Sequence, residues 1–202
     1  MMTISPDYFD QMYAAAADPW GFTSRWYEQR KYALTLAMLP AERYADAFEP
    51  GCSIGVLSAQ LARRCDHLLA WDIAAAAVES AAARTAGCGS VRVEQRALPG
   101  DWPDGQFDLI VMSEFLYYFG DDQLRPLLRR CRETLRPGGT LLAVHWRHPV
   151  AEYPRSGDSV HEELALLPGL ARVAEHREAD FIAEAYLRGE APVSVAQAGG
   201  LA

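Results

Sequence analysis

The run from Ala45 to Gly55, which reads ADAFEPGCSIG, most constrains what this chain can fold into. Its apolar beginning predicts a short buried strand over residues 45–49, and a helix is expected to begin near Val56. Gly51 and Gly55 predict a tight turn between the two, because glycine accepts positive φ and leaves room for a ligand beside the backbone. The first N–H groups of that helix lack partners within it, so they can bind carboxylate or nucleotide oxygens.

An acidic residue follows the next apolar run. Asp72 comes directly after Leu68-Leu69-Ala70-Trp71. Its distance from Gly51 is close to the roughly 20 residues at which a Rossmann-type site places a ribose-binding acid. The two oxygens of a carboxylate can accept from both ribose hydroxyls. Asp72 is therefore a candidate nucleotide-binding residue.

The spacing of the glycines distinguishes between cofactors. A dinucleotide fingerprint, G-x-G-x-x-G, would require glycine at positions 53 and 56, where this chain has Ser53 and Val56. The run E-P-G-C-S-I-G at residues 49–55 resembles motif I of the class I S-adenosylmethionine (SAM) methyltransferases, with Ser53 in place of the middle glycine. The alternative is a strand–turn–helix that binds nothing. The position of Asp72, after the next apolar run and at the expected distance from Gly51, argues against it.

Bulk properties exclude several classes of protein. A length of 202 residues suits one domain over residues 1–202. The formal net charge of -8 argues against a nucleic acid as the main partner, since phosphate backbones are bound by Lys and Arg. The N-terminus has no secretory-signal pattern, and no apolar run approaches the ~20 residues of a membrane span. The four cysteines include no C-x-x-C pair, so we expect free thiols in a reducing cytoplasm and no metal site.

Residues 1–40 are expected to form a helical segment ahead of the first strand. Ser5-Pro6 can begin one helix, and Thr23 or Ser24 can cap a second one that ends near Leu39. The segment is rich in aromatic residues, namely Tyr8, Phe9, Tyr13, Trp20, Phe22, Trp26, Tyr27 and Tyr32. It is either a helix pair packed on the sheet edge or a lid over the cofactor, because aromatic faces attract a sulfonium cation.

Residues 45–146 alternate between strand and helix patterns and predict a Rossmann-like core. Strands are expected at 45–49, 67–72, 91–94, 107–113 and 140–146, and helices at 56–65, 74–86 and 121–135. Right-handed crossovers make such a sheet parallel, with helices on both faces. Residues 147–190 are expected to form a substrate loop, a helix at 159–167 and a closing hairpin at 172–177 and 181–187, and residues 191–202 a frayed end.

Further motifs occur in a fixed order. They are Tyr8-Phe9-Asp10, Asp18-Pro19-Trp20, Tyr27-Glu28 with Lys31-Tyr32, the run at 49–55, Phe107 to Val111 with Ser113-Glu114, Leu116-Tyr117-Tyr118, and His145 to Pro149. Together they resemble the NodS family of SAM-dependent N-methyltransferases from about residue 8 to residue 188, and NodS-like sequences share the C-S-I-G form. The resemblance implies an α/β fold of the Rossmann-like class I methyltransferase type, a seven-stranded, mostly parallel sheet with an antiparallel last strand. It also implies SAM as cofactor and, as in oligosaccharide biosynthesis by NodS, methylation of the amino nitrogen of a de-N-acetylated glucosamine unit.

Candidate site residues follow from the rule that such sheets bind ligands beyond the carboxyl ends of their strands. The predicted cofactor-binding residues are Trp20, Glu49, Gly51, Cys52, Ser53, Gly55, Asp72, Ile73, Arg96, Ala97, Leu98 and Ser113. The predicted catalytic residues are Glu114, Tyr117 and His148. Glu114 is alternatively a helix-capping carboxylate. Tyr117 is alternatively a core residue, and for Tyr118 a core position is favoured. His145 is expected to be a core histidine, and His161 fits either role.

The chemistry of methyl transfer to an amine gives the acidic and imidazole groups a role. An amine must be neutral to attack, so Glu114 or His148 is expected to accept its proton. Arg147, Tyr153 and Asp158 add donors, acceptors and an aromatic face suited to a sugar. Three hypotheses remain: a methyltransferase for an amino sugar or another small O- or N-acceptor, an NAD-dependent oxidoreductase, which the glycine spacing disfavours, and a SAM-binding domain without activity.

Overall fold

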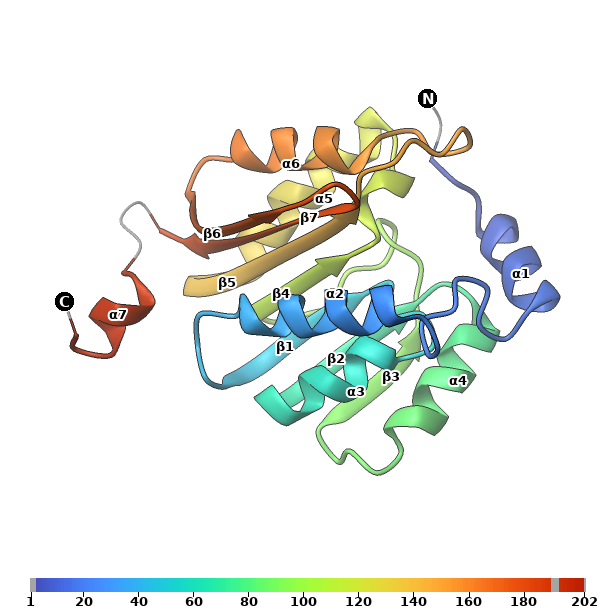
Figure 1. Ribbon diagram of the computed structural model, residues 1–202, viewed down its shortest axis with the longest axis horizontal. Helices are drawn as coiled ribbons and strands as arrows, with labels where there is room; N and C mark the ends of the chain where they lie inside the picture. The colour runs from blue at the N-terminus through green and yellow to red at the C-terminus, as the bar shows by residue number, and fades with distance from the viewer. Residues whose placement is uncertain (1–2, 190–192, 202) are drawn as a thin grey trace.

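The computed structural model describes residues 3–189 and 193–201, and its centre is a seven-stranded sheet in the order β3-β2-β1-β4-β5-β7-β6 (Figure 1). The strands are Tyr44–Pro50 (β1), Cys65–Asp72 (β2), Val91–Gln95 (β3), Phe107–Ser113 (β4), Leu135–Trp146 (β5), Leu170–Arg177 (β6) and Phe181–Arg188 (β7). β1 to β5 pair in parallel, whereas β7 is antiparallel to both β5 and β6. The predicted fold class, a mostly parallel sheet with an antiparallel last strand, is confirmed.

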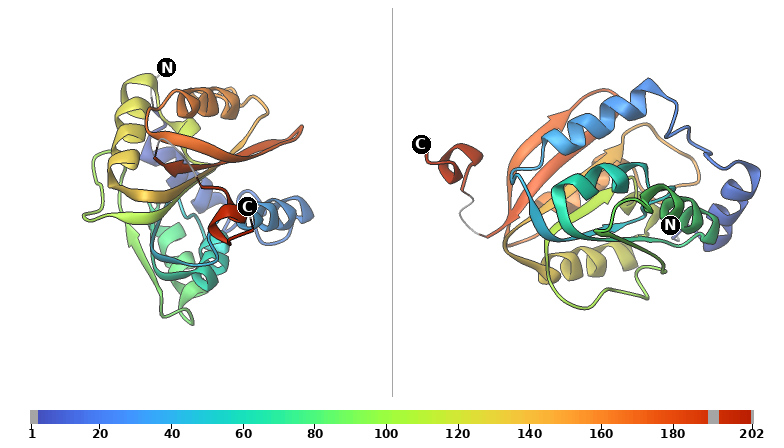
Figure 2. Two further views of the ribbon diagram at one scale, coloured as in Figure 1. Left: turned by 90° about the vertical axis from the view of Figure 1, so that its left-hand side faces the viewer. Right: turned by 90° about the horizontal axis from the view of Figure 1, so that it is seen from below.

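Helices cover both faces of the sheet (Figure 2). They are Pro6–Ala15 (α1), Trp26–Ala37 (α2), Val56–Leu61 (α3), Ala75–Thr85 (α4), Asp121–Thr134 (α5), Gly157–Ala165 (α6) and Val195–Ala198 (α7), with 3-10 turns at Ala62–Arg64 (η1) and Leu116–Tyr118 (η2). On one face Tyr32 of α2 and Leu57 of α3 pack in the core cluster that includes Leu109 of β4. On the other face Leu124 of α5 and Val160 of α6 pack in the cluster around Ile110.

Burial on both faces explains why the central strands form where the sequence is continuously apolar. β4 contains no exposed residue, and its residues 109–112 are fully buried. β1 lies beside it in parallel, with Ala47 opposite Leu109. The strand order reverses between these two strands, because the chain leaves β1 toward β2 and β3 and then crosses back to β4. Ligands of open α/β sheets bind at such a point, beyond the carboxyl ends of the strands.

The helix α1 lies beyond the carboxyl ends of the parallel strands (Figure 1). The backbone N–H of Ile4 donates to the carbonyl oxygen of Tyr118 at 3.0 Å. The phenol oxygen of Tyr13 in α1 lies 2.5 Å from the hydroxyl oxygen of Ser53 in the turn after β1. The residue Ile4, just before α1, is thus joined to the turn after β4, and α1 itself is joined to the turn after β1.

Several boundaries differ from the predictions. Neither Thr23 nor Ser24 caps α2, whose N-cap is Arg25, because the Asp18 carboxylate holds the N–H groups of Phe22 and Thr23 in a separate turn. The helix expected to reach residue 65 ends earlier, since Cys65 already pairs with Tyr44 as the first residue of β2. Of the expected frayed end at 191–202, residues 191, 192 and 202 lie outside the described residues, and residues 195–198 form α7.

Candidate functional site

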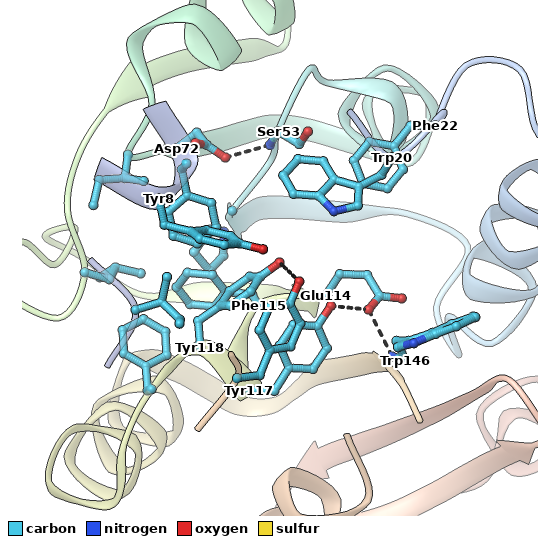
Figure 3. Close-up of a pocket in the computed structure, with 18 of the residues that line it drawn as sticks. Tyr8, Trp20, Phe22, Ser53, Asp72, Glu114, Phe115, Tyr117, Tyr118 and Trp146 are labelled. Carbon is cyan, nitrogen blue, oxygen red and sulfur yellow. Dashed lines mark hydrogen bonds between the residues drawn. The ribbon is translucent and has the colours of Figure 1, made fainter. Parts of the chain in front are cut away.

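A cavity of about 480 Å³ opens at the carboxyl ends of β1, β2, β4 and β5. Residues of α1, α2 and the segment between them form its outer wall, and the strand ends form its floor. Its size lies within the range of about 300–1,000 Å³ of small-molecule sites. Figure 3 shows Asp72 and Ser53 on one side of this cavity, and Glu114, Tyr117 and Trp146 on the other.

The turn after β1 forms the first side of the cavity. Gly51 has φ 71°, and a Cβ built on it would lie 2.8 Å from the Phe115 ring, so a side chain here would displace that ring. Ser53 also has positive φ, 52°, a conformation that residues other than glycine rarely adopt. This backbone explains why the general SAM motif has glycine at the position that Ser53 occupies.

Asp72 faces the same turn from the end of β2. One carboxylate oxygen accepts from the N–H of Ser53 at 2.8 Å and the other from the N–H of Ala74 at 3.0 Å. Burial raises the pKa of the Asp72 carboxyl, while these backbone donors oppose the rise. Ile73, Arg96 and Leu98 continue the wall beside it. The structure thus brings these four predicted residues together in the cavity wall.

Other residues of the same motif lie behind the wall and do not line the cavity. Glu49 is buried, and burial raises the pKa of its carboxyl to about 8, which favours the protonated form at neutral pH. Cys52 is buried too. A Cβ on Gly55 would lie 2.8 Å from the Cα of Ala81, so glycine at 55 permits the close packing of the turn on α4. The predicted Ala97 and Ser113 are likewise not among the lining residues.

Glu114 is the centre of the second side. Its Oε1 lies 2.7 Å from Lys31 Nζ, and its Oε2 accepts from the Tyr117 hydroxyl at 2.6 Å and from the Trp146 N–H at 2.9 Å. The backbone of Glu114 has φ 53°. Its carboxylate is held by two side chains and by the backbone N–H of Trp146 at the end of β5, so it does not cap a helix.

Lys31 and Glu28 complete a buried charge cluster with Glu114. Lys31 Nζ lies 3.0 Å from Glu28 Oε2, and the Lys31 side chain is only 3% exposed. Burial alone would lower the pKa of Lys31, but Glu114 and Glu28 outweigh it and raise the pKa. Burial raises the pKa of Glu28 more than Lys31 lowers it. One buried ammonium is thus shared by two carboxyl groups in the cavity wall.

Aromatic rings enclose the space above Glu114. Tyr117 stacks on Tyr153 with ring centres 5.0 Å apart, and Phe9 packs edge-on against Tyr118 at 4.9 Å. All four rings line the cavity, so Tyr118, for which a core position was favoured, belongs to the site wall. Beside the turn after β1, Trp20 stacks on Phe22 with ring centres 5.5 Å apart. Of the aromatic residues of the N-terminal segment, all but Trp26 and Tyr32 line the cavity.

His148 does not reach the cavity. Its Nε2 lies 2.8 Å from Asp180, and its side chain is half exposed. Arg147 and Asp158, expected to contact a sugar, form a bidentate ion pair with each other. The chain leaves β5 in this direction because Arg147 N–H donates to the carbonyl oxygen of Asp180.

The roles of Lys31 and Glu28 were missed in the sequence analysis, although both lie in a motif quoted for the resemblance. The available signal was their spacing, because residues three apart on a helix share a face. Within residues 3–189 and 193–201, no three His, Cys, Asp or Glu side chains group as metal ligands. No helix in these two ranges is long and apolar enough to cross a membrane.

Comparison with known proteins identifies the family of this chain. The family model described as Nodulation protein S (NodS) matches residues 8–163. The chain belongs to the NodS family. Nodulation protein S of Bradyrhizobium diazoefficiens is 32% identical over 130 residues, which are 63% of this chain and 62% of that protein. The chain thus matches less than two thirds of the length of this curated NodS relative.

Solved structures show the same fold. A proposed methyltransferase from Pseudomonas syringae is 47% identical, with a TM-score of 0.73, covering 81% of this chain and 100% of that one. The N-methyltransferase NodS from Bradyrhizobium japonicum WM9, in complex with S-adenosyl-L-homocysteine, has a TM-score of 0.82 at 23% identity, covering 93% of this chain and 100% of that one.

Proposed function

We propose that this NodS-family chain is a SAM-dependent methyltransferase that transfers a methyl group to an amine nitrogen. The observation that carries the proposal is the placement of Asp72 with the glycine turn on one side of a cavity and Glu114 on the other. The family match and the N-methyltransferase name of the similar NodS structure support it. A nucleotide-like cofactor and a proton acceptor then face one another across the same enclosed space.

The first side of the cavity fits SAM. At Gly51 the lack of a Cβ lets the Phe115 ring pack directly against the turn, and both residues line the cavity. Asp72 would accept from the ribose hydroxyls, and Ile73, Arg96 and Leu98 would flank the adenine. Trp20 and Phe22 would cover the cofactor and exclude water. When bound, SAM supplies a methyl group already activated by its sulfonium.

On the second side, Glu114 is the proposed proton acceptor. An amine has to lose a proton before its lone pair can attack, and a carboxylate within hydrogen-bond reach can take that proton. Lys31, Tyr117 and the Trp146 N–H hold the two Glu114 oxygens in place. Lys31 Nζ, 2.7 Å from Glu114 Oε1, also places a positive charge beside the proposed proton acceptor.

The acceptor that the NodS resemblance suggests is a de-N-acetylated glucosamine unit. The aromatic rings of the wall offer flat faces on which a pyranose can stack. The ion-paired Arg147 and Asp158 are less available to a sugar than expected. The largely aromatic wall favours a second candidate, a compact amine with an aromatic body. Labelled SAM with glucosamine-ended and N-acetylated oligosaccharides, and with tyramine, separates the two by mass spectrometry.

The proposal is tested with Glu114→Gln. We expect kcat to fall about 100-fold or more, the usual loss of a general base, while the affinity for S-adenosylhomocysteine hardly changes. The kcat/KM of the wild type should rise with pH as the acceptor loses its proton. Glu133→Gln is the matched control, since Glu133 is an exposed residue of α5. Tight cofactor binding without turnover of any acceptor would favour the domain without activity, and preferential binding of NAD in calorimetry would overturn the assignment.

A further inference from the structure

A series of hydrogen-bonded polar side chains runs from the acceptor side of the cavity, beneath α6, to Arg172 on the edge strand β6. It consists of His145 on β5, His161 on α6, Glu184 on β7 and Arg172 on β6. His145 Nδ1 lies 3.0 Å from His161 Nε2, and His161 Nδ1 lies 2.6 Å from Glu184 Oε2. The first three residues are at most 2% exposed. We call His145, His161 and Glu184 the histidine chain.

The histidine chain begins at the turn that carries Tyr117 and Glu114, the proposed proton acceptor. The Leu116 N–H donates to His145 Nε2 at 3.2 Å. Leu116 begins η2, two residues after Glu114 and one before Tyr117. The strand residues beside His145 hold Glu114 directly, because Val144 accepts from its N–H and the N–H of Trp146 donates to its carboxylate.

The direction of every hydrogen bond in the chain follows from its two ends. An amide N–H can only donate, so His145 Nε2 carries no proton and the neutral ring carries its proton on Nδ1. This proton is donated to His161 Nε2, which leaves the His161 proton on Nδ1, facing Glu184. Glu184 accepts it together with hydrogen bonds from Tyr186 and Arg172. One assignment of tautomers satisfies all partners.

A second proton on either ring would break this order. On His145 it would face the Leu116 N–H, and on His161 it would face the His145 donor. The groups around the chain are Lys31 from α2, Tyr117 from η2, Tyr186 from β7, and Arg172 with Glu175 from β6. Burial, together with His161 and Lys31, lowers the pKa of His145 well below its usual value. Burial opposes ionisation of Glu184, but His161, Tyr186 and Arg172 lower its pKa to about 2.

We infer that the histidine chain is a positioning device for the acceptor side of the site: His145 holds the Leu116 N–H, and thereby keeps Glu114 and Tyr117 directed into the cavity. Polar groups in a core need partners that apolar side chains of the same volume would not need. Leu116 itself is fully buried, so its amide has no water to replace His145. The consequence for catalysis rests on the proposed role of Glu114, whereas the structural claim does not.

The test uses the full chain, labelled with ¹⁵N, and needs no acceptor. Imidazole nitrogen shifts should show His145 neutral with its proton on Nδ1 from about pH 6 to pH 8. In His145→Leu, hydrogen exchange of the Leu116 amide should accelerate about tenfold or more, as for a buried donor left without a partner. The Ser53 amide, on the cofactor side, should keep its exchange rate. His145→Gln, whose side-chain oxygen can accept from Leu116, should restore slow exchange.

His176→Gln is the matched control, because His176 lies on β6 and contacts Glu178 at the surface end of the sheet. If His145→Leu does not fold, the exchange rates of the Leu116 and Ser53 amides are compared between wild type and His161→Gln instead. A His145 proton on Nε2, or an unchanged Leu116 rate in the variant, would overturn the inference, and so would equal acceleration at Leu116 and Ser53. With an active acceptor, kcat should fall in His145→Leu and recover in His145→Gln at constant affinity for S-adenosylhomocysteine. Absence of turnover in the wild type would count against the proposed function alone.

Discussion

Replacing Lys31 by Met should destabilise the protein far more than loss of a typical ion pair. Lys31 Nζ lies 2.7 Å from Glu114 Oε1 and 3.0 Å from Glu28 Oε2, with its side chain 3% exposed. Methionine has a similar length and fills the space without the charge. The variant therefore leaves the buried carboxyl group of Glu28 and the partly buried one of Glu114 facing one another across the position of the lost ammonium.

The magnitude follows from those distances. The two carboxylate oxygens lie at most about 6 Å apart, and two unit charges at this separation repel by about 3 kcal/mol at an effective dielectric constant of about 20. Removal of one partner from a buried ion pair costs about 3–5 kcal/mol. We expect the free energy of unfolding to fall by this amount at neutral pH. The loss is a large part of the roughly 5–15 kcal/mol that stabilises a domain.

The pH dependence has a definite sign. The repulsion raises the pKa of at least one of the two carboxyl groups in the folded variant above its unfolded value. The folded state then binds more protons than the unfolded state, so stability falls as the pH rises from about 4 through the raised pKa. Urea unfolding of wild type and variant at several pH values measures this. The difference between the two proteins should be smallest at the acidic end.

Two further variants distinguish a buried ion network from an ordinary exposed ion pair. Arg43→Met removes an exposed ion pair with Asp66 and should cost less than about 1 kcal/mol. Glu28→Gln in the Lys31→Met background removes one of the two opposing charges and should recover most of the stability. A Lys31→Met protein that loses less than about 1 kcal/mol, with a difference from wild type independent of pH, would show that the cluster is not a buried ion network.

Three further predictions concern the cofactor side. Asp72→Ala should weaken S-adenosylhomocysteine binding by about 1.5–3 kcal/mol in calorimetry, the usual loss for hydrogen bonds to a charged group, and unchanged affinity would remove Asp72 from the site. Gly51→Ala should reduce both thermal stability and cofactor affinity, because φ is positive and the Phe115 ring lies in the way, whereas Gly87→Ala, with nothing within 4 Å, should change neither. Residues 8–32 should exchange amide hydrogens more slowly when S-adenosylhomocysteine is bound, because the aromatic segment closes over it; equal protection would indicate a static wall.

The sheet could be predicted because its strands carry their own signals. β4 is an unbroken apolar run, and the alternation with helices leaves a parallel sheet as the expected arrangement. Helix ends were harder, since the Asp18 side chain decides where the turn before α2 closes. Start points of strands depend on their partners, as Cys65 on Tyr44 shows.

The two sides of the site differed in how far the sequence could predict them. Gly51, Ser53 and Asp72 were placed from local motif spacing, which depends on neighbours along the chain. Lys31 meets Glu114 only through the packing of α2 on the sheet, 83 positions apart in sequence, and no local pattern records that contact. His148 was placed from its position after a strand, but the direction of its side chain depends on Asp180, another distant residue.

Ser53 and Glu114 are the two residues other than glycine that have positive φ within residues 3–189 and 193–201, and they lie on opposite sides of the cavity. A left-handed backbone costs a residue with a side chain about 1–2 kcal/mol that glycine does not lose. Glycine at position 53 would relieve this strain but remove the hydroxyl that contacts Tyr13 of α1. Glycine at position 114 would relieve it too, but it would remove one of the two partners of the buried Lys31, and such a loss costs about 3–5 kcal/mol. The charge cluster therefore outweighs the strain at Glu114, and a library screened only for melting temperature should accept glycine at position 53 more readily than at position 114.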